Sequence, residues 1–581
     1  MQIPTYDTLA SMLTGRTGLF IVLLFGGLFF YLGCYRAVTL PAGDFASYYT
    51  SSRLVLDGTF KKADVYDYYN FEKSTENYFN RTLSSFLPLP PSTALMLIPL
   101  AWLPPEPARV VFMLINVACL VLLIWMLRRL TRLSLPVLVS VILLSGISLW
   151  SDVREGQVYL LLTVLIVAAL VLERDGKRFA AGLLLGLALP VKYFTLLFVI
   201  YFLFRKRYRL VIGAAAAALA VFGAGLIAGG LKMNLYYLSV ILPRHLAGRI
   251  QNPFTVHFQS FDSLFNRIFI PNGTLNPHPI LDAPFLGMWL RSFVPLLAVS
   301  LLVAAIFELR HTPEHERTLY SAAVLVLFGL AVSPASATYH LTLLIVPMTI
   351  LFALTAEEIL HDDMYFIRKR LPIMFGVYLA ITLVPFYKLY GFKTDPLLQL
   401  LSYLRLLLIA SFFLLSLPPK IFGTKGFRGL IGAAIVLSIL AGYIRLPQKS
   451  LGDGAKWAGV HGLIIPRLYR SGDAVFYMRD TRWGYIEKKL EPVTDPDTRP
   501  AFNSGSDLEP TIFDSTVGES TQLFVRNNRN GVVARLTGRG LHNTDPVWNA
   551  DRSRLYFLSD RGRGIDCTTI FYFPASRVRI P

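Results

Sequence analysis

The feature that most constrains the fold of this chain is a series of apolar segments, each about as long as a helix that crosses a bilayer. They lie at 18–38, 108–127, 134–150, 157–173, 210–230, 285–306, 318–333, 339–355, 371–391, 397–417 and 427–445. A helix needs about 20 apolar residues to span a hydrocarbon core of about 30 Å. Charged residues make up 16% of the chain, below the roughly 25% of soluble domains, and mean hydropathy is +0.51. The sequence therefore predicts an all-α polytopic membrane domain and excludes a soluble enzyme, a coiled coil and a disordered chain.

The net charge of +19 is distributed in a way that favours membrane topology over nucleic-acid binding. Residues 447–581 hold 19 basic and 15 acidic side chains, which leaves 37 basic and 22 acidic ones before them. Most of the excess therefore lies between apolar segments, where basic residues mark the cytoplasmic side of a membrane. No nucleic-acid partner is implied.

One apolar stretch, 179–204, conflicts with a simple alternation of crossings. Basic clusters at 174–178 and 205–209 flank it, so a single crossing would place one cluster on the wrong side. We predict a re-entrant pair of half-helices with its tip at 190–192, because a broken helix is tolerated at membrane depth where it is buried in protein or lines a wet cavity. Lys192 supports this, since charge inside a membrane is costly and often functional. The alternative is one ordinary helix with Lys192 extended toward the membrane surface.

With this hairpin, we predict about eleven spans in the cell membrane, a cytoplasmic N-terminus and an extracytoplasmic C-terminal domain. The outer side then receives the long segments 39–107 and 231–284 and the short connections 151–156, 334–338 and 392–396. Nearly every residue that could carry chemistry falls on that side.

The composition changes near residue 447, which divides the chain into a membrane domain, 1–446, and a polar domain, 447–581. Three stretches of the second part look alike, at 466–480, 510–526 and 546–560. Each has a proline, an aromatic strand-like run, a polar turn and a second such run, and they recur about every 40 residues, the period of propeller blades. The last resembles the TolB-type propeller repeat. Because propellers need about four to eight blades, we predict a small, open all-β array with a structural or substrate-presenting role.

The segment after the first span holds the strongest candidate for a catalytic group. Asp44 follows the span directly, and Tyr48, Tyr49 and Arg53 come shortly after it. A carboxylate at the boundary between bilayer and water is partly desolvated, which raises its pKa toward the range of a general base. Arg53 can bind a phosphate, and flat tyrosine rings can stack on a sugar. Alternatively, Asp44 caps a helix and the tyrosines belong to an interfacial belt.

Other polar candidates lie on or near the same predicted face. They are the acids Asp152 and Glu155, the glutamines Gln157 and Gln259, the cations Lys192 and Arg244, and His340. Asp152 or Glu155 is either a second acid or a helix cap. His340 either donates a proton or hydrogen bond to a phosphate or is a buried structural histidine.

The motifs of several other chemistries are missing from the sequence. It has no Gly-rich phosphate loop, no zinc-ligand spacing and no serine nucleophile elbow. We therefore predict no cofactor, and no metal is required by this interpretation. A transferase that works outside the membrane has no access to nucleotide sugars, so it needs a lipid-linked donor.

The ordered set of motifs resembles glycosyltransferase family 87, within the GT-C membrane glycosyltransferases. The motifs are Gly43-Asp44-Phe45 with Tyr48-Tyr49, Pro91-x-x-Ala94-Leu95 with Pro99-Leu100 and Leu103-Pro104, Gly156-Gln157 with Leu160-Leu161-Leu162, Ala181-Gly182 to Gly186 with Lys192, Gln259-Ser260, and Ser333-Pro334 with His340. They span residues 20–360 in the order of the family. Two features depart from its pattern: Tyr339 stands where members often have a second histidine, and the β tail is unusual for the family.

The resemblance implies a GT-C-like enzyme of glycan biosynthesis in the cell envelope. Such an enzyme transfers a mannosyl or arabinofuranosyl unit from a polyprenyl-phosphate donor to a lipid or glycan acceptor on the extracytoplasmic face, with inversion. It also implies that Asp44 is the general base and that His340 contacts the donor phosphate. Arg53, Lys192 and Arg244 are further candidates to offset the charge of the leaving phosphate. The remaining donor-binding candidates are Tyr48, Tyr49, Gln157 and Gln259.

Two other classes of function compete with this interpretation. A transporter or lipid flippase would explain the many spans, the broken helix and Lys192, but not the long aromatic outer loops or the lack of an obvious internal repeat. A membrane scaffold that presents the β tail would tolerate replacement of Asp44 and His340, whereas an enzyme would not.

Overall fold

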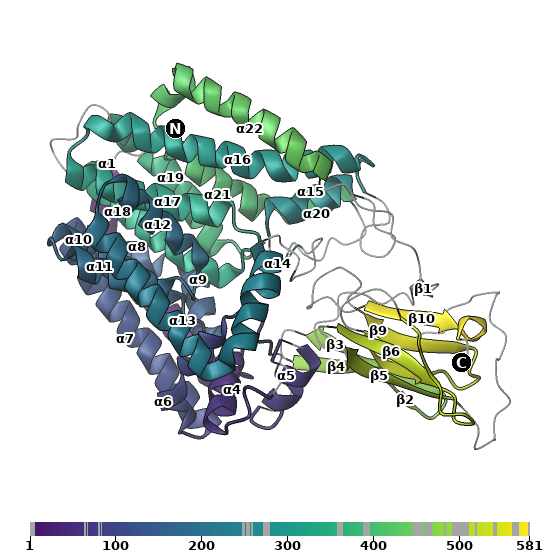
Figure 1. Cartoon of the computed structure of the whole chain (residues 1–581). Helices are drawn as coiled ribbons and strands as arrows, with labels where there is room; N and C mark the ends of the chain where they lie inside the picture. Colours follow the sequence, from purple (N-terminus) through teal and green to yellow (C-terminus); the bar gives the residue numbers. More distant parts are fainter. Residues whose placement is uncertain are drawn as a thin grey trace.

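The computed structural model has a body of packed helices with a smaller assembly of β-strands beside it (Figure 1). The structure describes residues 6–62, 65–66, 68–79, 82, 84–246, 250, 256, 259–270, 279–356, 364–386, 388, 396–444, 456–457, 468–481, 484–490, 510–517, 520–537, 543–559 and 569–578. The last described α-helix ends at Ile444, and the first described strand begins at Lys456.

Five of the described helices are long and apolar enough to cross a membrane, or six if one bent pair is counted as a span. They are the continuous helix of α2 (Arg16–Leu28), η1 (Phe29–Tyr35) and α3 (Arg36–Thr39); α7 (Pro105–Thr131); α13 (Tyr208–Tyr236) with η4 (Tyr237–Ile241); α16 (Pro284–Glu308) with η5 (Leu309–His311); and η6 (Thr338–Leu344) with α18 (Ile345–Ala356). A multi-pass membrane protein is thereby confirmed. The total of about eleven spans and the orientation of the termini stay predictions.

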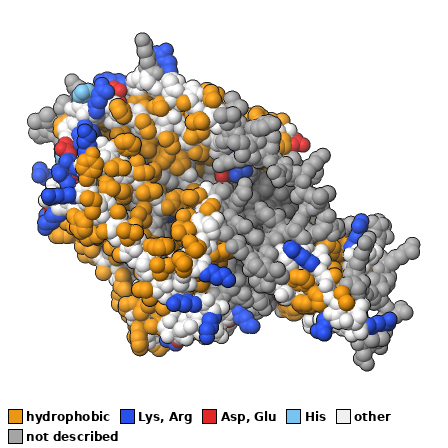
Figure 2. Space-filling model, in the orientation of Figure 1, with side chains coloured by type: hydrophobic (Ala, Val, Ile, Leu, Met, Phe, Trp, Pro, Cys, Tyr) orange, Lys and Arg blue, Asp and Glu red, His pale blue; other side chains and the backbone are white. Residues whose placement is uncertain are grey.

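The surface of the helical body is apolar in the way that a lipid-facing surface requires. Large hydrophobic side chains such as Leu23, Leu219 and Ile227 are more than 60% exposed. Figure 2 shows hydrophobic side chains covering the visible face of the helices, with Lys and Arg gathered along its edges. An exposed apolar area of this extent marks contact with lipid or protein.

The remaining described helices complete the body. They are α1 (Tyr6–Thr14), α4 (Phe45–Leu56), α5 (Tyr68–Thr75), η2 (Pro91–Leu95), α6 (Ile98–Ala101), α8 (Leu135–Leu143), α9 (Gly146–Glu155), α10 (Tyr159–Arg174), α11 (Arg178–Ala188), η3 (Tyr193–Thr195), α12 (Leu196–Phe204), α14 (Leu242–Leu246), α15 (Phe261–Phe269), α17 (Glu314–Ala331), α19 (Tyr365–Leu383), α20 (Pro396–Leu401), α21 (Leu404–Leu415), η9 (Pro419–Gly423) and α22 (Lys425–Ile444).

The segment expected as one span at 134–150 is instead bent by 68° between α8 and α9. The bend comes at Gly146, whose φ of +49° ends the regular helix. Tyr378 and Thr382 of α19 donate side-chain hydrogen bonds, both 2.8 Å long, to backbone carbonyls just before the bend. Such partners make a broken helix tolerable inside a membrane protein. As a result, α9 carries its acidic C-terminal end away from the line of α8.

The reversal of direction predicted within 179–204 is confirmed by the packing of α11 against α13. The backbone at Gly182 lies against Leu210, and that at Gly186 lies against Ala214. Because both contacts advance together along the two helices, α11 and α13 are parallel. The chain must therefore turn back between them, through the break after α11 and then α12.

The two ends of this hairpin also lie on one side of the body. Arg207, after α12, forms a 3.4 Å ion pair with Glu173, before α11. Its electrostatic neighbours include Arg178 at the start of α11. The two basic clusters thus lie together, and the alternative of one ordinary helix is wrong.

The segment between the first span and α7 folds into short helices that cover one end of the body. Two apolar clusters hold it together, one around Phe45 and Tyr49 and one around Phe60 and Phe86. The helix η2 packs on α13, where Pro91 lies beside Gly229. This layer gives α4 a fixed position over the turn between α9 and α10.

The tail forms three small antiparallel sheets. One contains β2 (Leu468–Ser471), β3 (Ala474–Thr481) and β4 (Gly484–Lys489); the second contains β5 (Thr511–Val517), β6 (Ser520–Arg526) and β7 (Val533–Arg535); the third has the order β1 (Lys456–Trp457), β10 (Thr569–Pro574), β9 (Arg554–Ser559) and β8 (Asn543–Trp548), with η10 (Ala575–Arg577) after β10. Each predicted repeat corresponds to one strand pair, β2–β3, β5–β6 or β8–β9. The small β-sheets are confirmed, while their TolB-type relationship and outer location stay predictions.

Candidate active site

The candidate site forms where the segment after the first span meets the turn between α9 and α10. A Cβ added to Gly43 would lie 2.9 Å from the Cα of Glu155, and one added to Gly156 would lie 2.5 Å from the Cβ of Phe45. Gly156 also has a φ of +68°, which favours glycine. The two glycines therefore allow two backbones, about 110 residues apart in the sequence, to pack directly on each other.

Asp44 lies at this contact, and its carboxylate accepts hydrogen bonds from the side chains of Gln157 and Tyr339. Gln157 is held in turn by Tyr48, whose hydroxyl donates to Oε1 at 3.2 Å. Although Asp44 precedes α4, its side chain makes no capping hydrogen bond. The interpretation of Asp44 as a helix cap is therefore wrong.

The surroundings of Asp44 raise its pKa from 3.8 to about 6. Burial is the main cause, and the negative charge of Glu155 adds to it, whereas the hydrogen bonds from Gln157 and Tyr339 oppose it. A carboxyl group with this pKa is mostly ionised at neutral pH and is still basic enough to accept a proton during a reaction. Burial raises the pKa of Tyr48, so its hydroxyl stays a hydrogen-bond donor.

The two secondary acid candidates have different partners. Asp152 is fully buried and accepts hydrogen bonds from the backbone N–H groups of Tyr159 and Leu160, at 3.2 and 3.0 Å. It therefore caps the start of α10, one of the two roles considered for it. Glu155 forms an ion pair with Arg154 and acts on Asp44 through its charge.

Tyr159, at the start of α10, connects the carboxylate to basic side chains. Its ring centroid lies 5.5 Å from that of Tyr339 and 4.6 Å from that of His340. The Nζ of Lys192 lies 5.7 Å from the same ring. Since Tyr339 hydrogen-bonds Asp44, these five side chains form one continuous cluster. The structure thus brings together Asp44, Lys192 and His340, which the sequence places in three distant segments.

Two histidines of this region, one in the cluster and one beside it, have defined protonation states. Nδ1 of His340 accepts a hydrogen bond of 3.2 Å from the backbone N–H of Ala337, so the neutral ring carries its proton on Nε2. His245, on α14, packs its ring 5.6 Å from that of Tyr193. Burial and the charge of Lys192 lower the pKa of His245 to about 3, so it is neutral at physiological pH.

Two of the expected donor-binding residues have structural partners in the segment between the first span and α7. Arg53 donates a 3.1 Å hydrogen bond to the carbonyl of Ala101 and forms a 3.2 Å ion pair with Asp57. The hydroxyl of Tyr49 donates to the carbonyl of Leu103 at 2.8 Å. No described contact joins these two side chains to the cluster around Asp44, and their binding role stays a prediction.

Gln259 connects α21 to the segment that leads to His340. Its amide donates to the carbonyl of Ser402 and accepts from the N–H of Leu406 at 3.2 Å, while its backbone pairs with that of Ser336. These contacts position the loop before η6. The side chain of Arg244 lies outside the described residues.

Arg405 is a basic residue of this region that the sequence analysis missed. It is 3% exposed and donates to the Thr338 hydroxyl at 2.8 Å and to the Ser336 carbonyl at 3.3 Å. It is also an electrostatic neighbour of His340. The sequence contained a signal for it, because Arg405 is a charged residue inside the apolar segment 397–417.

The cluster therefore has a basic carboxylate at one end and Lys192 with His340 at the other. Such an arrangement can remove a proton from one substrate while stabilising negative charge on a second. Among the described residues, no group of three or more His, Cys, Asp or Glu side chains could hold a metal ion.

Comparisons with solved structures find weak similarity to ArnT from Cupriavidus metallidurans. Its apo structure and its structure bound to undecaprenyl phosphate share 14% sequence identity with this chain, and both have a TM-score of 0.30. The alignments cover 73% and 74% of this chain and 77% and 78% of ArnT. No curated protein matches the chain.

The model of glycosyltransferase family 87 matches residues 86–334. This range includes the hairpin, the turn that carries Gln157, and Gln259, whereas Asp44 and His340 lie outside it. The resemblance inferred from the motifs is thereby confirmed: the chain is a multi-pass membrane protein that resembles glycosyltransferase family 87 over residues 86–334.

Proposed function

We propose that the protein is an inverting membrane glycosyltransferase that uses a polyprenyl-phosphate sugar as donor. The sugar is of the mannose or arabinofuranose type, and the acceptor is a lipid or glycan on the extracytoplasmic face of the cell membrane. The match to glycosyltransferase family 87 supports the reaction class. The residues of the cluster support the mechanism.

In this mechanism, the acceptor hydroxyl attacks the anomeric carbon of the donor. Its proton passes to a carboxylate oxygen of Asp44 as the new C–O bond forms. The bond between the anomeric carbon and the phosphate oxygen breaks, and its electron pair leaves with the polyprenyl phosphate. One displacement of this kind inverts the anomeric carbon, and no covalent enzyme intermediate is formed.

The leaving phosphate needs positive charge or hydrogen-bond donors near it. Lys192 and His340 lie around the Tyr159 ring, and Tyr339 spans from that ring to Asp44. A donor phosphate beside Lys192 and His340 would therefore place its sugar on the side of Asp44. This distribution of charge is what an inverting transfer requires.

The observation that carries the proposal is the state of Asp44. It is a carboxylate held by two side-chain donors, with its pKa raised to about 6 in a site built by the contact of two backbones. The hydrogen bonds fix its orientation and leave it basic. This arrangement is unfavourable for a protein with only a scaffold role, because burial of a carboxylate destabilises the fold.

The decisive experiment is a transfer assay with the full-length protein in lipid nanodiscs. Purified protein is given polyprenyl-phosphate mannose, arabinofuranose or another sugar in turn, with a short glycan acceptor. The product is identified by mass spectrometry, and its anomeric configuration by NMR. We expect one donor to be consumed with inversion.

Matched variants separate catalysis from folding. Asp44→Asn should abolish most transfer, whereas Asp57→Asn, which alters an exposed acid on the same segment, should leave it nearly unchanged. A product with retained configuration would contradict the single displacement. Movement of a fluorescent polyprenyl phosphate across the bilayer, without transfer from any donor, would support the flippase alternative instead.

A further inference from the structure

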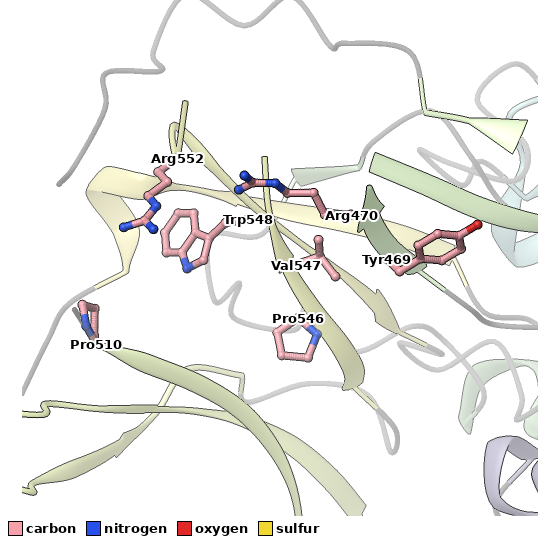
Figure 3. Close-up of a pocket in the computed structure, with 7 residues that line it drawn as sticks. All are labelled: Tyr469, Arg470, Pro510, Pro546, Val547, Trp548 and Arg552. Carbon is pink, nitrogen blue, oxygen red and sulfur yellow. The ribbon is translucent and has the colours of Figure 1, made fainter. Parts of the chain in front are cut away.

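The β tail contains a pocket that the proposed transfer reaction does not use. Its volume is about 390 Å³, within the range of roughly 300–1,000 Å³ typical of small-molecule sites. Figure 3 shows Arg470, Trp548 and Arg552 among the side chains that line it. The pocket is partly open, so a bound molecule could extend beyond it.

All three sheets contribute to this pocket. Tyr469 and Arg470 come from β2, Trp548 from β8, and Pro510 from the residue before β5. The pocket therefore exists only when the three predicted repeats pack together.

Hydrogen bonds from β8 hold the sheets in place around the pocket. The N–H of Asp545 donates to the Asp514 side chain at 3.2 Å, and the Asp545 side chain accepts from the N–H of Leu468 at 3.4 Å. Behind them, the buried Asn543 side chain donates to that of Gln522 at 3.1 Å. The pocket is thus a built feature of the fold.

The chemistry of the lining is cationic and aromatic. None of the described residues that line the pocket is acidic. In the view of Figure 3, the indole of Trp548 lies between the guanidinium groups of Arg470 and Arg552. Arginine stays protonated at all physiological pH values, so Arg470 and Arg552 each bring a positive charge to the pocket.

We propose that this pocket binds a saccharide that carries an acidic group. A guanidinium presents a planar pair of donors that matches a carboxylate or a phosphate, and an aromatic ring offers a flat apolar face to a sugar. Arg470 and Arg552 bind the acidic group, and Trp548 packs on the ring of the sugar. This site goes beyond the proposed transfer reaction, and its test requires no transferase activity.

Calorimetry on the full-length protein in nanodiscs measures binding of each probe and so tests the proposal. The probes are a galacturonic acid trimer, galactose 6-phosphate, a neutral galactose trimer and inorganic phosphate. We expect at least one acidic sugar to bind at least tenfold more tightly than the neutral trimer and inorganic phosphate. Equal binding of the neutral trimer, or stronger binding of phosphate alone, would overturn the proposal, as would no binding of either acidic sugar at millimolar concentration.

Two variants locate the binding in the pocket. Arg552→Asn should weaken binding of the acidic sugar at least tenfold. Asparagine tolerates the φ of +56° at this turn, so the fold should be kept. Arg529→Gln, which alters an exposed arginine in another turn of the tail, should bind like the wild type. Weaker sugar binding by Arg552→Asn, with an unchanged unfolding temperature, supports binding in this pocket. Unchanged binding in Arg552→Asn, or an equal loss in Arg529→Gln, would overturn it.

A second pair of variants separates this site from the helical one. Arg470→Gln should also weaken binding of the acidic sugar, since it removes the other guanidinium of the pocket. Asp44→Asn should bind the acidic sugar like the wild type, because Asp44 lies in the helical body. Weaker binding in Asp44→Asn would show that the sugar occupies the helical site and would overturn the proposal.

Discussion

The helical site and the tail pocket both place basic side chains near aromatic rings, but they differ in how they treat charge. In the helical site, the Asp44 carboxylate is held by Gln157 and Tyr339, and burial shifts its pKa to about 6. In the tail, Arg470 and Arg552 line a partly open pocket whose described lining residues include no acid. A buried acid with a raised pKa is suited to proton transfer, whereas arginines, which stay charged at all physiological pH values, are suited to recognition.

The two regions also differ in how the chain builds them. The helical site depends on close backbone contact at Gly43 and Gly156 and on a hairpin that delivers Lys192 to Tyr159. The tail pocket depends on three sheets joined by hydrogen bonds around β8. Small changes of backbone should therefore damage the first site more than the second.

The largest expected effect is that of Asp44→Asn on transfer. Asparagine keeps the size of the side chain but cannot accept the acceptor proton. General-base catalysis contributes about 10²–10⁴-fold, so the transfer rate should fall by at least 100-fold. Donor affinity, measured by equilibrium binding, should persist. A folded variant with near-normal turnover would remove Asp44 from the mechanism. The contrast between a proton-transferring helical site and a recognising tail pocket would then fail.

The stability of the same variant checks the assigned cause of the pKa shift. The pKa of Asp44 is higher in the folded protein, about 6, than its ordinary value of 3.8. The folded state therefore binds this proton more tightly, and wild-type stability falls as the pH rises through that interval. Above pH 6, Asp44→Asn should unfold at the same temperature as the wild type or a higher one. A lower unfolding temperature would indicate a structural role for the charge.

The next largest effect should follow from the close contact at Gly156. In Gly156→Ala, the added Cβ would lie 2.5 Å from the Cβ of Phe45, so the two backbones must separate and move Gln157 away from Asp44. Transfer should fall at least tenfold, while binding of acidic sugar to the tail stays unchanged. Gly58→Ala is the control, because Gly58 has a similar φ of +67° but no atom within 4 Å of the added Cβ. Equal losses of transfer in both variants would indicate that backbone strain alone causes the effect.

Much of this architecture could be predicted from the sequence, because its signals are periodic or paired. The two basic clusters around 179–204 predicted the hairpin, and the three similar stretches of the tail predicted its strand pairs. The bend at Gly146 was not predicted, since the segment 134–150 has no charged residue and was expected as one span. The partners that make the bend tolerable, Tyr378 and Thr382, come more than 230 residues later in the chain.

The candidate site was predictable in its residue types but not in its partners. The position of Asp44 after the first span made it the candidate base, yet its hydrogen bonds to Gln157 and Tyr339 depend on contacts between distant segments. Arg53 and Tyr49 were chosen for their chemistry, and the structure gives them backbone carbonyls as partners. Local sequence does not distinguish a tyrosine that packs inside a protein from one that faces a substrate.

The pH dependence of transfer should reflect the ionisation of Asp44. Below pH 6 the carboxylate becomes protonated and can no longer accept the acceptor proton. The value of kcat/KM should therefore level off above about pH 7 and approach a tenfold fall for each pH unit well below 6. Acidic-sugar binding to the tail should lack this transition. A profile that is flat down to pH 4 would contradict the raised pKa.

A smaller effect is expected from Glu155→Gln. The negative charge of Glu155 raises the pKa of Asp44, so its removal should lower that pKa and move the acidic limb of the profile to lower pH. Transfer at neutral pH should change little, because Asp44 is already mostly ionised there. Glu173→Gln, which alters an acid at the opposite end of α10, is the control. A shift to higher pH, or equal shifts in both variants, would contradict the electrostatic coupling.

The smallest expected effect on catalysis is that of removing the tail. Every residue of the cluster around Asp44, and also Arg405, belongs to the helical body, so a chain that ends at residue 445 retains all of them. Transfer to a short, neutral acceptor should stay close to the wild-type rate, while binding of the galacturonic acid trimer should be lost. The shortened chain must first elute as a single species with a cooperative thermal transition. If it does so and is still inactive, the tail takes part in the transfer itself, and the division between a reacting region and a recognising region fails.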